Sequence, residues 1–132
     1  MGQTYSVNLH VKFNDEQGAA DALRSKIRRG PAERTDYNID HYRSLGIGTD
    51  SVWDLLKIFF GGWEGKLEKA PGSKSRHTHL QSGFDACYGW EGVMMDAFDE
   101  IAPFLAPGSS IRIYPDSGCD YGKISNGKAN WK

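Results

Sequence analysis

The run Thr4-Tyr-Ser-Val-Asn-Leu-His-Val-Lys-Phe13 alternates apolar and polar side chains along its whole length. A period of two places successive side chains on opposite faces of a β-strand. We therefore predict a strand over residues 4–13 with one buried and one polar face. The apolar face would carry Tyr5, Val7, Leu9, Val11 and Phe13, and the polar face Ser6, Asn8, His10 and Lys12.

Helical spacing recurs in four segments further along the chain. We expect helices over residues 15–29, within 37–45, over 52–60 and over 89–105, and Asn14 or Asp15 would cap the first. The last segment has the clearest pattern, because its apolar residues recur three, four and seven positions apart. These residues are Trp90, Val93, Met94, Ala97, Phe98, Ile101 and Leu105.

The remaining extended runs predict an antiparallel sheet. Residues 63–70 and 74–84 flank Pro71-Gly72, and residues 121–125 and 128–131 flank Asn126-Gly127, so each pair is typical of a hairpin. Residues 110–114 form one more alternating run. The predicted order is β-α-α-α-β-β-α-β-β-β, and it favours a single α+β domain over residues 1–132 with a mostly antiparallel sheet.

Composition excludes several classes of protein. The chain has 132 residues, of which 39% are hydrophobic and 25% charged, as in globular domains and unlike disordered chains. The net charge of −1 argues against general nucleic-acid binding, since domains of that class are usually strongly basic. There is no apolar leader or membrane-length apolar run, so we expect no membrane partner and a cytoplasmic location. Cys87 and Cys119 would then be reduced and partly buried.

The stretch between His77 and Ile111 contains no Lys or Arg. Its acidic side chains either form a solvated helix face or meet a basic protein partner. Tryptophan is enriched at interface hot spots, and two tryptophans fall at the ends of predicted elements, although core packing is the alternative for both. The candidate partner-binding residues are Glu91, Asp96, Asp99, Glu100, Trp63 and Trp131.

His77-Thr78-His79 is the sharpest chemical feature. Residues two apart on a strand project to the same face, so His77 and His79 could share a transition metal such as zinc. A zinc site needs three or four ligands, and the spacing supplies two. Solvent-facing strand histidines are the alternative.

A basic segment, residues 24–34, could bind a phosphate ligand through Arg28, Arg29 and Arg34. Cys87 beside His77 or His79 would be a conceivable nucleophile, and a small buried thiol is the alternative. The chain has no Gly-x-Ser-x-Gly, Walker or dinucleotide motif, so we expect no enzymatic activity and no obligatory cofactor.

Three segments carry a resemblance: Gly83–Leu105, Gly108–Ser117 and Asn126-Gly127-Lys128. Together they are similar to small uncharacterised accessory proteins encoded by conjugative elements and phages of gut Firmicutes. The resemblance implies a bacterial or phage protein of a mobile genetic element, with no catalytic residues to transfer, and a role in modulating host defence. We therefore expect a non-enzymatic binding protein acting on a protein partner. The alternative is a metal-binding protein or metal-dependent hydrolase centred on His77 and His79.

Overall fold

A computed structural model describes residues 2–29, 39–70, 77–87 and 89–132. Their helices are α1 (Glu16–Arg29), α2 (Ile39–Ser44), α3 (Val52–Phe60) and α4 (Trp90–Ile101), followed by the 3₁₀ turn η1 (Ala102–Phe104). Their strands are β1 (Gly2–Val11), β2 (Glu68–Lys69), β3 (Thr78–Cys87), β4 (Ser110–Tyr114), β5 (Asp120–Ser125) and β6 (Lys128–Trp131). The predicted α+β class and element order are confirmed.

All six strands join one antiparallel sheet in the order β2-β3-β1-β4-β5-β6. Strand β1 lies between β3 and β4, and β3 lies between β2 and β1. Each helical crossover, from β1 to β2 and from β3 to β4, therefore spans a strand that belongs to the other crossover. This is the split β-α-β arrangement. The β5–β6 hairpin extends the sheet beyond β4.

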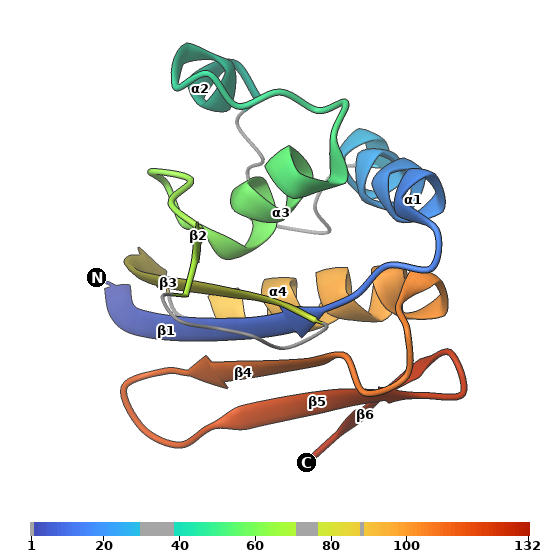
Figure 1. The fold of residues 1–132 in the computed structure, drawn as a ribbon. Helices are drawn as coiled ribbons and strands as arrows, with labels where there is room; N and C mark the ends of the chain where they lie inside the picture. The colour runs from blue at the N-terminus through green and yellow to red at the C-terminus, as the bar shows by residue number, and fades with distance from the viewer. Residues whose placement is uncertain (1, 30–38, 71–76, 88) are drawn as a thin grey trace.

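The helices cover one face of the sheet. In Figure 1, α4 runs behind β1 and β3, and it packs against both α1 and α3. The apolar residues of β1 face this layer and are fully buried, as the alternation predicted. The largest fully buried side chains around them include Tyr5, Leu9, Leu23, Phe59, Phe60, Met94, Phe98 and Ile111.

The opposite face of the sheet is polar and open in the described part of the chain. Strand pairing places His10 beside His79 and Ser110, and Asn8 beside Gln81 and Arg112, on this face. Residues Ser6, Gln81 and Arg112 are exposed there. The sheet therefore has one buried apolar face and one accessible face that carries polar side chains.

The predicted strand over 63–70 was largely wrong. Only Glu68–Lys69 are extended, and the residues before them form turns in which Gly62 and Gly65 have positive φ angles. Gly62 has a φ of 71° and its Cα lies against the Phe84 ring, so a glycine is required. The Pro71-Gly72 turn lies outside the described residues.

The segment 89–105 begins as predicted but changes its geometry before its end. Helix α4 stops at Ile101, and Pro103 sits in η1, because proline has no amide hydrogen for an interior helical bond. In the β5–β6 hairpin, both Asn126 (φ 54°) and Gly127 (φ 73°) are left-handed, as a type I′ turn requires. No helix in the described ranges is long and apolar enough to span a bilayer.

Candidate binding groove along β3

Strand β3 is paired along its full length on one side only. On the other side, β2 pairs with it at Leu80 and Gln81, and no described strand lies beside it further on. The His79 carbonyl accepts a hydrogen bond from Ala70 on the β2 side. Backbone groups of an antiparallel strand alternate in direction, so the amides and carbonyls of Gly83 and Asp85 point to this same side. This edge is therefore a row of backbone donors and acceptors available to another strand.

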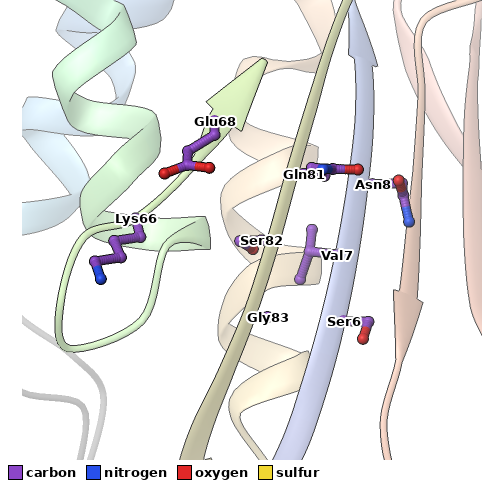
Figure 2. Close-up of a pocket in the computed structure, with 8 residues that line it drawn as sticks. All are labelled: Ser6, Val7, Asn8, Lys66, Glu68, Gln81, Ser82 and Gly83. Carbon is purple, nitrogen blue, oxygen red and sulfur yellow. The ribbon is translucent and has the colours of Figure 1, made fainter. Parts of the chain in front are cut away.

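A groove borders this edge. Its first part, about 430 Å³, is lined by Ser6, Val7, Asn8, Lys66, Glu68, Gln81, Ser82 and Gly83 (Figure 2). A second part, about 390 Å³, continues past Gly83 to Thr4, Phe84 and Asp85, with Gly61, Trp63, Glu64 and Lys66 opposite. The two parts share Lys66 and Gly83. Together they follow β3 from Gln81 to Asp85, with the chain that precedes β2 as the facing wall.

Trp63 is held in this wall by its neighbours. Its ring stacks on His41 with centroids 3.6 Å apart, and its carbonyl oxygen lies 2.6 Å from His41 Nε2. The indole is nevertheless 55% exposed. Next to it, the buried Tyr42 hydroxyl donates to the Gly62 carbonyl at 2.8 Å. An ordered, exposed indole beside a groove is a typical anchor for a partner.

The groove carries an excess of negative charge. Of its carboxylates, Glu64 is paired with the ammonium of Lys66 at 3.2 Å. Glu68 and Asp85 are both exposed, and the Asp85 carboxylate accepts a hydrogen bond from the Thr4 hydroxyl at 2.8 Å. Lys66 is the one cation among the lining residues of both parts. The groove therefore favours an occupant with basic side chains.

The predicted partner-binding residues are spread over separate parts of the molecule. Asp96 and Asp99 are exposed on α4, and Asp99 accepts a hydrogen bond from the Trp131 indole at 2.9 Å. Trp131 also packs edge-on against the core residue Phe98. These two contacts give Trp131 a structural role, and its predicted role in binding a partner stays a prediction.

At the other end of α4, Glu91 lies near the start of β1. The Gln3 side-chain amide donates a hydrogen bond to its carboxylate at 3.4 Å. Burial raises the pKa of Tyr5, and the nearby Glu91 carboxylate raises this pKa further. Glu100 is half-buried on α4. Among the six candidates, Trp63 alone lines the groove.

The two predicted metal ligands differ in their surroundings. His79 lies on the open face, where its ring stacks on His10 with centroids 3.9 Å apart and its Nε2 is 3.1 Å from Asn8 Oδ1. His77 precedes β3 and lies near Gly108. Within the described ranges, no three His, Cys, Asp or Glu side chains come together to hold a metal. The sequence did not indicate that the His79 ring stacks on His10.

Burial lowers the pKa of His10, and the nearby His79, His77 and Arg112 charges lower it further. This environment therefore favours the uncharged form of His10.

The remaining candidates are placed only in part. Arg28 and Arg29 belong to the end of α1, but their side chains and the whole of Arg34 lie outside the described structure. Cys119 is a free thiol and is exposed, so the expectation that it is partly buried was wrong. It lies in the turn before β5, where Gly118 has a positive φ.

Lys66, Glu68, Gln81 and Gly83 were missed as candidates. The alternating strand pattern could have indicated Gln81 and Gly83 as outward-facing, but the groove beside them depends on how short β2 is. Comparison of the chain with protein-family models, curated proteins and solved structures finds no match.

Proposed function

We propose that this protein is a non-catalytic binding domain that captures an extended, basic segment of a protein partner in the groove along β3. The observation that carries the proposal is the unpaired edge of β3 facing a groove with an exposed tryptophan. A peptide added there as a strand would bond to the backbone at Gly83 and Asp85. Its side chains would alternate between the open face of the sheet, on which Gln81 and Glu68 lie, and the helix-covered face.

Charge and shape support a basic occupant. Glu68 and Asp85 lie along the same edge, and Trp63 offers an exposed ring on which an arginine or an aromatic side chain can stack. The resemblance to mobile-element accessory proteins would make the partner a host protein in the cytoplasm. That part of the proposal rests on the resemblance alone.

The test starts from a peptide library displayed on phage and selected against the immobilised protein. We expect the selected peptides to be basic and extended, and to slow hydrogen exchange of the Gly83 and Asp85 amides. Glu68→Lys and Trp63→Ala should each weaken the selected peptides about tenfold, the loss expected for a hot-spot residue. Gly83→Pro removes one outward amide hydrogen and should abolish strand addition.

The matched control is Asp96→Lys with Glu100→Lys, which places similar charge changes on α4. Unchanged binding by this variant, together with loss in the groove variants, supports the groove. If the α4 variant loses binding and the groove variants keep it, the acidic helix surface is the partner site and the proposal fails. Circular dichroism of each variant separates lost binding from lost folding.

A further inference from the structure

The open face of the sheet beyond the groove carries a concentration of positive charge. Register places Arg112 of β4, Lys123 of β5 and Lys128 of β6 on this face. Lys12 directly follows β1. Lys132 lies opposite Tyr121, and the Lys132 backbone amide donates a hydrogen bond to the Tyr121 carbonyl at 2.9 Å. Among the side chains that β1, β4, β5 and β6 present to this face there is no carboxylate.

Aromatic rings and a guanidinium plane lie among these cations. Tyr114 is 37% exposed at the end of β4. The guanidinium of Arg112 lies over the Tyr121 ring, with Cζ 4.5 Å from the centroid, so its outer plane faces solvent. The stacked His10 and His79 rings continue the row toward β3. Aromatic rings and guanidinium planes are the surfaces on which unpaired bases stack.

We infer that this face binds single-stranded nucleic acid, the lysines and Arg112 contacting phosphates while bases stack on Tyr114 and Arg112. Two features favour this occupant over an acidic protein. The cations of β4, β5 and β6 have no carboxylate between them, as a continuous phosphate chain requires, and planar stacking groups separate them, while Glu68 and Asp85 lie on the far side of β1. The surface adjoins the β3 groove, because Ser6 and Asn8 line the groove and pair with Tyr114 and Arg112. The inference rests on the cations and rings of β4, β5 and β6, so it does not depend on the function proposed above.

The fold accounts for such a site in a chain of net charge −1. Residues 77–132 hold four basic side chains, and all four, Arg112, Lys123, Lys128 and Lys132, fall on the open face. Asp96 and Asp99 of the same segment are exposed on α4, behind the sheet (Figure 1), and Asp85 lies on the open face at β3, beyond β1 from these cations. The electrostatic potential of one face, rather than the net charge of the whole protein, governs the approach of a polyanion to that face.

Fluorescence polarisation with labelled oligothymidine and oligouridine of about 12 nucleotides tests the inference, since single-strand sites span about 4–16 nucleotides. We expect binding of at least one probe at low salt, with a slope of log K against log salt of up to about −3.5 from five phosphate contacts. A preference between the two probes would tell DNA from RNA. No binding at about 100 µM protein, the weak limit for non-specific complexes, overturns the inference.

Charge variants test the location of the site. Arg112→Gln with Lys123→Gln should flatten the salt slope by about 1.4, because each lost phosphate contact removes about 0.7. The matched control is Arg43→Gln, which removes an exposed cation from α2, away from the sheet. An equal loss in the Arg43 variant would show attraction without a site, and the inference would be abandoned.

Stacking variants separate nucleic acid from other polyanions. Tyr114→Ala should weaken binding by about 5-fold to 100-fold, the usual effect of losing one base–aromatic stack, and Tyr114→Phe should restore most of it. Polyglutamate of equal length should compete poorly. If it competes as well as oligothymidine, and Tyr114→Ala binds normally, the face is a docking surface for acidic proteins and the nucleic-acid assignment is wrong.

Discussion

Replacing Gly62 with alanine should destabilise the protein well beyond the usual cost of a left-handed alanine. Gly62 has a φ of 71°, and a Cβ there would come within 2.5 Å of the Phe84 ring. The backbone conformation alone costs an L-residue about 1–2 kcal/mol. Forcing a methyl group into a packed contact adds about 1–3 kcal/mol. We therefore expect Gly62→Ala to lower the free energy of unfolding by about 2–5 kcal/mol.

Gly46→Ala is the matched control. Gly46 also has a positive φ, 83°, but a Cβ at that position would meet no heavy atom within 4 Å. It should cost only the conformational share, about 1–2 kcal/mol. Urea unfolding followed by tryptophan fluorescence measures both values, because the chain contains four tryptophans. The difference between the two variants isolates the contact with Phe84.

A double-mutant cycle makes the reasoning refutable. In a Phe84→Gly background both the ring and the Cβ of Phe84 are gone, so Gly62→Ala should cost no more than Gly46→Ala does. If Gly62→Ala and Gly46→Ala destabilise the protein equally, or if the cycle shows no coupling, the contact does not constrain this turn. The outcome also bears on the groove, because Gly62 precedes Trp63 and Phe84 lies in the opposite wall.

Three further predictions concern single groups. Tyr42→Phe should lower the free energy of unfolding by about 1–3 kcal/mol in urea titration, because it leaves the Gly62 carbonyl without its buried donor. Ser51→Ala should cost about 1 kcal/mol in the same assay, since Ser51 caps α3 through the Trp53 amide. The lowered pKa of His10 means that the unfolded chain takes up its proton first as pH falls below about 6.5, so folding stability should decrease from that pH downward. His10→Asn should show a shallower decrease between pH 7 and 5 in thermal unfolding, and parallel curves would contradict the assignment.

The elements were predictable where a single local rule decided them. The alternation of Tyr5, Val7, Leu9 and Val11 identified β1 and its buried face, and Asn126-Gly127 identified the last hairpin. The segment before β2 was not predictable in this way. Its residues were read as extended, whereas turns at Gly62 and Gly65 carry the chain past the Phe84 ring and the Ile47 side chain. Such close approaches are set by tertiary packing, which a local pattern does not contain.

The candidate site was predicted less well, because it depends on pairings between distant strands. The sequence indicated His77 and His79 as a pair, yet the ring that stacks on His79 is that of His10, almost seventy residues earlier. Likewise the groove depends on β2 ending after two residues, beyond which no strand of the described ranges pairs with that side of β3. A strand edge becomes visible only when the length of each partner is known.

Charge shows the same dependence on the fold. Between His77 and Ile111 every Asp, Glu, Lys or Arg is acidic, whereas residues 112–132 hold four basic and two acidic side chains, and the net charge of the whole chain is −1. The fold turns this linear order into two surfaces, because α4 lies on one side of the sheet while β4, β5 and β6 present their cations on the other. The net charge of the chain argued against general nucleic-acid binding, whereas the charge of the open sheet face favours it. For a small α+β domain, the charge of each sheet face is therefore the quantity to weigh when a polyanionic partner is considered.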